Sequence, residues 1–263
     1  TSWAGIRQTG RKGRHGFLAA SLGLIAWGLL PLCFELPTSL ESNPGRSPRI
    51  LDRRGVVLDD APRADFFRHQ PVSPEDIPSA LLDATLVAED KRFFSHDGMD
   101  YLATARATRD LLHNRRIISG ASTITQQLVK ISSDPVERTI LTKIRESLVA
   151  RHLEYRWSKE EILTAYFNRL DYGNHRQGCR EAARFYFGKP LGDLSLAECA
   201  LLAGLPQSPS LHNPVHNAQS ALQRRNWILD RLAEERDYDP RQIAAARQEP
   251  LNLHRVSPGE IAP

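Results

Sequence analysis

An uncharged run of 19 residues near the start of the chain constrains its structure more than any other sequence feature. The run extends from Gly16 to Phe34 (GFLAASLGLIAWGLLPLCF), close to the roughly 20 residues with which a helix crosses a bilayer. It follows four basic residues, Arg7, Arg11, Lys12 and Arg14. The positive-inside rule therefore places residues 1–15 in the cytoplasm and directs the chain outward after the run. We expect a transmembrane anchor over residues 16–34 and an extracytoplasmic remainder.

A cleaved signal peptide is the alternative, because signals share the basic start and the apolar middle. The run exceeds the usual apolar part of a signal, which is about 7 to 15 residues long. No convincing small-x-small cleavage site follows it between Cys33 and Pro37. The uncleaved anchor is the favoured interpretation, and cleavage stays open.

The rest of the chain is predicted to form one mainly helical domain. Of the 263 residues, 41% are hydrophobic, which is enough for a substantial core. Residues 35–49 are rich in Pro, Ser, Asn and Gly and indicate a linker, whereas residues 251–263 indicate a polar tail. Between them, residues 50–250 form the domain, with a short strand pair over 50–58 that turns at residues 52–55. The net charge of +4 favours anionic partners, such as phospholipid headgroups or a pyrophosphate, and does not indicate nucleic acid.

Two cysteines outside the predicted anchor, Cys179 and Cys199, leave two interpretations open. An oxidising compartment would allow them to pair. Each also lies in an apolar helical context, which favours two buried free thiols.

Apolar periodicity predicts four helices that carry the chemically interesting residues. They cover residues 79–90, the segment after Gly120, residues 136–155 and residues 159–170. In the third helix, Ile140, Ile144 and Leu148 are expected to face inward. The fourth helix begins with Ser158 and Glu161, whose spacing is typical of a capping box.

Glu89 is a candidate general base at the end of the first helix. A carboxylate that accepts a proton works best with a raised pKa, and burial among apolar groups disfavours its charged form. Glu89 shares a helix face with Leu82 and Leu86. The helix C-terminus and the adjacent Asp90 further disfavour negative charge there. The alternative is a partly exposed Glu89 that pairs with one of the basic residues after it.

Two polar stripes lie on the following helices. Thr123, Gln127 and Lys130 share one face, which either lines a groove for a sugar and its phosphate or faces solvent. Lys143 and Glu146 are neighbours one turn apart. They form either an ordinary salt bridge or a site for pyrophosphate, with or without a divalent cation such as Mg²⁺ or Mn²⁺.

Other reaction classes find little support in the sequence. It contains no nucleophile elbow, Walker loop, Rossmann glycine pattern or paired-cysteine zinc site, and neither the Ser-x-x-Lys nor the Lys-Thr-Gly signature of transpeptidases. His96 precedes an Asp-Gly turn, so a structural role is favoured over metal binding. His212 and His216 flank Pro214, which favours a loop over a helical metal site.

Taken together, these segments resemble glycosyltransferase family 51, the peptidoglycan polymerases that occur as monofunctional transglycosylases and in class A penicillin-binding proteins. Five blocks in the family's order carry the resemblance, which is more specific than any one motif. The blocks are Glu89 to Gly98, Gly120 to Lys130, Lys143 to Glu146, Glu161 to Asn168 with Gly173 and Gly178, and Ala182 to Lys189, and the likeness continues from Leu194 to Pro209.

The resemblance implies a mainly α fold with a lysozyme-like head and a smaller membrane-proximal lobe. It implies that lipid II is polymerised on the outer face of a bacterial inner membrane, with inversion and release of undecaprenyl pyrophosphate. The partners would be lipid II, the growing lipid-linked glycan, the membrane and other proteins of cell-wall synthesis.

The resemblance also implies roles for individual residues. Glu89 matches the general base, and Glu146 matches a second essential glutamate beside the donor pyrophosphate or its metal. Lys130 and Lys143 match basic residues near the phosphates. The remaining positions that match substrate contacts are Asp90, Ser122, Thr123, Gln127, Arg145 and Asn168.

One departure from the family pattern affects the pyrophosphate side. Thr142 stands where the family has an arginine, and Arg145 in the same helical turn is the residue expected to compensate. The form of residues 142–145 is similar to penicillin-binding proteins of the 1C type. Two other functions stay open: a lysozyme-like enzyme that cleaves glycan with a buried glutamic acid, and a weakly active scaffold that binds lipid II.

Overall fold

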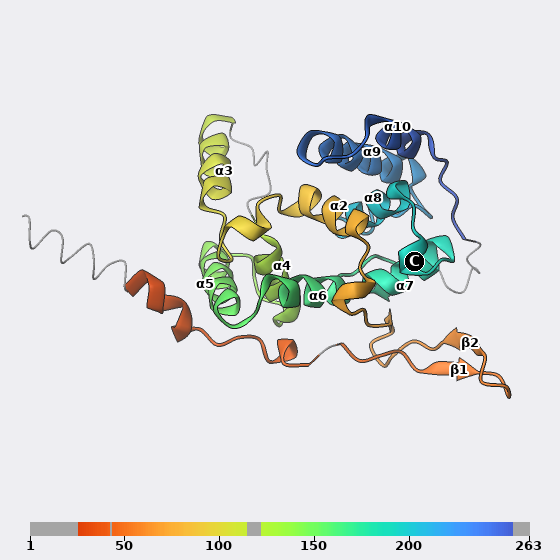
Figure 1. Cartoon of the computed structure of the whole chain (residues 1–263). Coiled ribbons are helices and arrows are strands. Elements are labelled where there is room, and N and C mark those ends of the chain that lie inside the picture. Colours follow the sequence, from red (N-terminus) through yellow and green to blue (C-terminus); the bar gives the residue numbers. More distant parts are fainter. Residues whose placement is uncertain (1–25, 43, 115–121, 255–263) are drawn as a thin grey trace, which may run out of the picture.

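The computed structural model describes residues 26–42, 44–114 and 122–254, and helices dominate them (Figure 1). The α-helices are α2 (Ser79–Glu89), α3 (Tyr101–Asn114), α4 (Ile124–Ser132), α5 (Ile140–Arg156), α6 (Lys159–Arg169), α7 (Cys179–Phe187), α8 (Leu196–Gly204), α9 (Ala218–Glu235) and α10 (Pro240–Gln248). The strands are β1 (Arg49–Leu51), β2 (Val57–Asp60), β3 (Arg68–His69) and β4 (Arg176–Gln177). The mainly α class predicted from the sequence is therefore confirmed.

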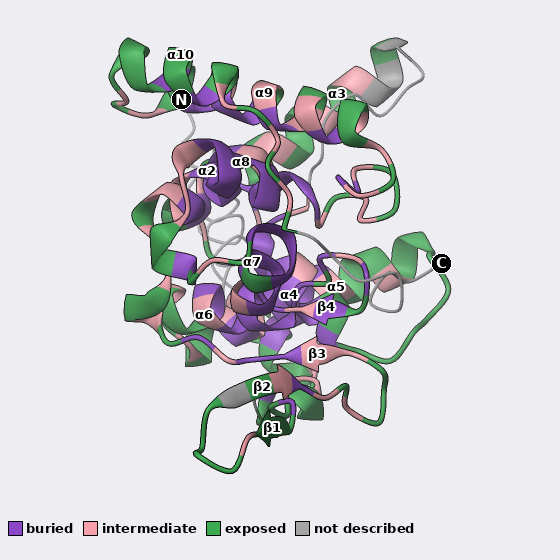
Figure 2. Ribbon diagram, turned by 90° about the vertical axis from the view of Figure 1, so that its right-hand side faces the viewer, coloured by how far each residue is buried: buried purple, intermediate pink, exposed green. Residues whose placement is uncertain are grey.

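The helices form two groups around one core. Helices α2, α8, α9 and α10 pack on one another, and α4 packs on α5 and α6, while α7 contacts α8. Figure 2 shows the buried residues concentrated where these groups meet. Leu81 of α2, Ile124 and Leu128 of α4 and Tyr166 of α6 are fully buried in a single hydrophobic cluster. The end of α2 and the start of α4 are thereby fixed beside each other.

The two small sheets lie outside the helical core. β1 and β2 pair antiparallel, with Arg49 opposite Asp60, and confirm the predicted strand pair. β3 and β4 pair in parallel. The first sheet extends away from the helices in Figure 1.

Helix starts follow the capping patterns of the sequence. Thr123 caps α4 and accepts a hydrogen bond from the Gln126 N–H, while Ser158 and Glu161 form the predicted capping box of α6. Each cap satisfies backbone donors that the first turn leaves free.

The start of α5 differs from the prediction. The helix begins at Ile140 instead of Val136, and the inward orientation predicted for Ile140 and Ile144 is wrong, because their side chains are 81% and 52% exposed. Burial in α5 begins at Ser147, and Leu148 is buried as predicted. Periodicity alone does not show how much of a helix has a neighbour to pack against.

The predicted anchor over residues 16–34 lies partly outside the described residues. Among those described, no helix combines the length and the apolar composition needed to cross a bilayer. The predicted linker is held against the domain, since Arg169 donates to the carbonyl oxygens of Ser39 and Ser42 at 2.9 and 2.6 Å. His152 Nδ1 lies 2.6 Å from the Phe34 carbonyl oxygen.

Cys179 and Cys199 are buried free thiols, the alternative that their helical context favoured. Burial raises the pKa of each thiol to about 12, which keeps both in the neutral form near neutral pH.

Two glycines with nearly the same positive φ angle provide a test of how tightly the loop after α2 packs. Gly98 has φ +80° and Gly55 has φ +81°. A Cβ at Gly98 would lie 2.8 Å from the backbone of Ala150, whereas no atom of the described residues lies within 4 Å of a Cβ at Gly55. We expect Gly98→Ala to lower the free energy of unfolding by about 2 kcal/mol or more, and Gly55→Ala by only about 1 kcal/mol. Urea denaturation of both variants measures the difference, and equal losses would show that the loop yields.

Candidate active site

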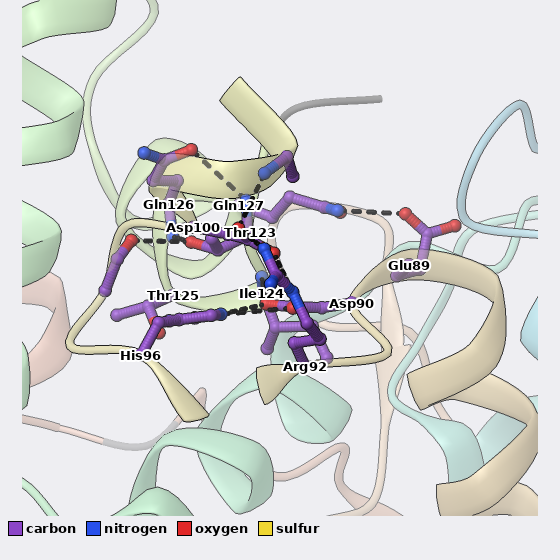
Figure 3. A network of polar contacts seen from close by, with 12 residues as sticks. Glu89, Asp90, Arg92, His96, Asp100, Thr123, Ile124, Thr125, Gln126 and Gln127 are labelled. Carbon is purple, nitrogen blue, oxygen red and sulfur yellow. Dashed lines mark hydrogen bonds and ion pairs between the residues drawn. The ribbon is translucent and has the colours of Figure 1, made fainter. Parts of the chain in front are cut away.

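Glu89 is the last residue of α2, and its carboxylate is held by two other helices. Gln127 Nε2 of α4 donates to Glu89 Oε2 at 2.9 Å, and Figure 3 shows this side chain reaching across to the glutamate. Arg224 Nη2 of α9 lies 3.5 Å from Glu89 Oε1. Oε1 is buried without a hydrogen-bond partner among the described residues. One carboxylate oxygen is thus fixed by a hydrogen bond, and the other faces Arg224 without one.

Burial gives Glu89 the pKa direction that a general base needs. Removal from water raises the pKa of its carboxyl, the Gln127 hydrogen bond and the Arg224 charge oppose that rise, and the Asp90 charge adds to it. The 13% exposure of the Glu89 side chain fits the burial inferred from the sequence, and the partners expected in the alternative, Lys91 and Arg92, pair instead with Glu235 and Asp100.

The orientation of the Gln127 amide is set by a residue that the sequence did not single out for chemistry. The fully buried Tyr166 donates its hydroxyl to Gln127 Oε1 at 3.0 Å. The amide NH₂ group must then face Glu89, since the carboxylate can only accept. Gln127 therefore positions the candidate base.

Asp90 joins the end of α2 to the start of α4. Its carboxylate accepts from the Ile124 N–H at 3.0 Å and lies 3.0 Å from His96 Nε2, as Figure 3 shows. A negative charge at a helix N-terminus is favourable. Asp90 borders the candidate cavity, and these internal contacts give its carboxylate a structural role, while its expected substrate contact stays a prediction. His96 has the structural role that its sequence context favoured.

Asn168 does not lie in the predicted groove. Its side chain is buried, with Oδ1 accepting from the Val72 N–H and Nδ2 donating to the Val72 and Thr164 carbonyl oxygens. These three bonds use both N–H donors of the amide within the fold and give Asn168 a structural role, and its expected substrate contact stays a prediction.

A cavity of about 220 Å³ opens at Glu89. Ser122 and Thr123 line it, as expected, although the Thr123 hydroxyl is used to cap α4 and to donate to the Gly98 carbonyl oxygen at 2.7 Å. Side chains of α9 that no sequence motif indicated, among them Trp227 and Arg231, form another part of the wall.

The predicted pair on α5 is connected to this cavity through Ser122. Lys143 Nζ donates to Ser122 Oγ at 2.7 Å and lies 3.3 Å from Glu146 Oε2. Ser122 also borders the cavity at Glu89, so it links the candidate pyrophosphate pair to that cavity, which Lys143 and Glu146 do not themselves line.

The other predicted cations lie on the surface. Lys130, in the last turn of α4, and Arg145 are exposed, and neither forms an ion pair within the described segments. Thr142 serves the start of α5, since its hydroxyl donates to the Glu137 carbonyl oxygen at 2.8 Å. Compensation by Arg145 and a phosphate contact by Lys130 stay predictions.

Metal binding has limited support. Within the described ranges, no three His, Cys, Asp or Glu residues lie close enough together to hold a metal ion. The Glu146 side chain is 17% exposed, and its ion-pair partner within the described segments is Lys143. It could serve one coordination position of a cation that substrate phosphates otherwise hold.

Comparisons with known proteins place these residues in a family context. A family model described as Transglycosylase matches residues 57–233. The chain is 42% identical over 199 residues to Penicillin-binding protein 1A of Pseudomonas aeruginosa, covering 75% of this chain and 24% of that protein. It is 37% identical over 230 residues to Penicillin-binding protein 1A of Haemophilus influenzae, covering 88% of this chain and 26% of that protein.

A solved structure is also similar. The crystal structure of Penicillin-Binding Protein 1A from Haemophilus influenzae matches with a TM-score of 0.49 and 24% identity, over 81% of this chain and 22% of that chain. The chain spans about a quarter of the length of these relatives. Both curated relatives are of the 1A type, which does not support the 1C type suggested by residues 142–145.

Proposed function

The chain belongs to the transglycosylase family, the peptidoglycan glycosyltransferases of family 51, and we propose that it polymerises lipid II into glycan strands. The observation that carries the proposal is the buried carboxylate of Glu89, a residue that lines a cavity, with one oxygen held by Gln127 and the other without a hydrogen-bond partner among the described residues. The Lys143 and Glu146 pair connected to the same cavity supports it further.

In the proposed reaction, Glu89 Oε1 accepts the proton of the acceptor sugar hydroxyl. The hydroxyl oxygen forms a bond to the anomeric carbon of the lipid-linked glycan as the bond from that carbon to the pyrophosphate oxygen breaks. Attack from the face opposite the leaving group inverts the anomeric configuration. The raised pKa of Glu89 suits this role, because a base works best when its pKa lies near the working pH.

On the leaving-group side, we assign Lys143 to the undecaprenyl pyrophosphate. A cation held in place by Ser122 and Glu146 would stabilise the negative charge that develops on the departing oxygen. A divalent cation that accompanies the pyrophosphate would be held by Glu146 together with phosphate oxygens, and it would supply further charge stabilisation.

We also propose an extracytoplasmic location for this domain, anchored by residues 16–34, with a lysozyme-like head and a membrane-proximal lobe. The uncharged run after a basic segment supports the anchor. The lipid-linked glycan, the membrane and other wall-synthesis proteins would be the partners.

Glycan cleavage is the second candidate, because a glutamic acid with a raised pKa can also protonate a glycosidic oxygen. Incubating the purified protein with lipid II separates the candidates. The expected result is polymeric glycan with stoichiometric release of undecaprenyl pyrophosphate. Soluble fragments from purified peptidoglycan, without polymer from lipid II, would indicate a lytic enzyme. Binding of lipid II without turnover would indicate a scaffold.

A further inference from the structure

A cation from α9 lies beside the candidate base, although 135 residues separate the two in the chain. The side chains of Arg224 and Glu89 are 12% and 13% exposed, and Nη2 of the arginine lies 3.5 Å from Oε1 of the glutamate. The guanidinium carbon lies 4.4 Å from the centroid of the Trp227 ring, three residues along the same helix face. Arg224 is therefore held on one side by an aromatic ring and directed at the carboxylate on the other.

The end of α8 also makes room for this arginine. A Cβ built at Gly204 would lie 2.7 Å from Cγ of Arg224 and 3.3 Å from Cδ1 of Ile228. The stem of the arginine thus runs directly over a glycine. Even an alanine there would displace Arg224 near its base, where the side chain has little freedom to adjust.

We propose that Arg224 is the positioning residue that keeps Glu89 ionised and correctly oriented for proton acceptance, with Trp227 and Gly204 holding Arg224 in place. The proposal rests on the proposed function of Glu89 as the base. Gln127 fixes Oε2, and Arg224 balances the charge from the Oε1 side.

The distance of 3.5 Å between Arg224 Nη2 and Glu89 Oε1 supports this positioning role. This distance is too long for a hydrogen bond. The positive charge of Arg224 therefore stabilises the carboxylate without occupying the Oε1 lone pair that must accept the substrate proton. Arginine also keeps its charge at every working pH. A lysine at this place could lose its proton on burial, and a neutral donor would not offset the burial of the carboxylate.

Nearby charges are largely paired with one another. Asp90 lies beside His96, Lys91 pairs with Glu235, and Arg231 pairs with Glu234. Arg224 is the cation that pairs with Glu89 within the described part of the chain. The charged and titratable groups around Glu89 are Asp90 and Lys91 after α2, Asp100 and Arg106 around α3, Tyr166 of α6, and Arg224, Arg231 and Glu235 of α9.

The pH dependence of lipid II polymerisation tests the proposal. The base is active when ionised, so the rate rises with pH through the pKa of Glu89. Removing the cation raises that pKa, and Arg224→Met should shift the rising limb to higher pH by about one unit or more. Arg224→Lys should leave the limb closer to its original position. Gly204→Ala should shift the limb in the same direction as Arg224→Met without any change of charge in the sequence.

Arg241→Met is the matched control, because it removes one exposed arginine from α10 and should leave the limb in place. A rate that falls equally at every pH in Arg224→Met, with an unmoved limb, would mean that Arg224 has only a structural role.

A second readout separates this inference from the proposed function. Infrared difference spectra against Glu89→Gln report the protonated carboxyl band of Glu89 directly. The pH at which the band appears should rise in Arg224→Met even in the absence of substrate, and an unchanged pH overturns the inference. A wild-type protein that never polymerises lipid II defeats the proposed function instead, whatever the carboxyl band does.

Discussion

Replacing Glu89 by glutamine is expected to reduce polymer formation from lipid II by about 10²- to 10⁴-fold, the usual contribution of a positioned general base. Glutamine has nearly the same shape, and its carbonyl oxygen can still accept from Gln127 as the carboxylate does. The amide cannot take the proton of the acceptor hydroxyl. The loss should therefore appear in the rate at saturating lipid II and not in its binding.

Glu160→Gln provides the control, because Glu160 is an exposed glutamate on α6. It should polymerise lipid II at the wild-type rate. Circular dichroism and thermal unfolding of both variants establish that each is folded. Unchanged turnover in a folded Glu89→Gln protein would remove Glu89 as the base and with it the proposed mechanism.

The elements that the sequence predicted well are those set by neighbouring residues. The cap at Ser158 depends on the side chain of Glu161, three positions away, and it forms as predicted. The strand pair around Gly55 likewise depends on a local turn. Such interactions can be recognised in a sequence because both partners are close together in it.

The inward face of α5 shows where that reasoning stops. Ile140 and Ile144 have the spacing of core residues, yet both are exposed, because burial in α5 starts only at Ser147. The sequence of a helix does not show how far the neighbouring elements extend along it, and so does not show which turns they bury.

In the candidate site, too, properties set by nearby residues were predicted, whereas contacts between distant helices were not. The raised pKa of Glu89 followed from its own helix face, and its direction is confirmed. The contacts of Glu89 with Gln127 and Arg224 join helices that are distant in sequence, so neither could be inferred from spacing. The family resemblance indicated Asn168 as a substrate contact but gave no information about its surroundings. In the structure its side chain is buried and bonded to Val72, which gives it a structural role.

Lys143→Met is expected to lower the rate of polymer formation by about 10²- to 10³-fold, similar to the loss of one well-placed electrostatic donor at a transition state. The same change should hardly affect folding. The lysine side chain is 46% exposed, and its bond to Glu146 is an i, i+3 surface pair of the kind that contributes only about 0.2–0.5 kcal/mol. A large kinetic loss with little change in the free energy of unfolding would therefore locate the effect in catalysis.

A comparison with the double variant Lys143→Met/Glu146→Gln decides how Lys143 acts. If Lys143 contacts the pyrophosphate, removing the neighbouring negative charge does not restore the lost rate, and this is the expected outcome. Recovery in the double variant would mean that Lys143 only neutralises Glu146, whose uncompensated charge would otherwise repel the phosphates. Arg156→Met, which removes an exposed cation at the opposite end of α5, should retain the wild-type rate. A comparable loss in that control would assign the effect to the overall charge of the helix instead of to the Lys143 site.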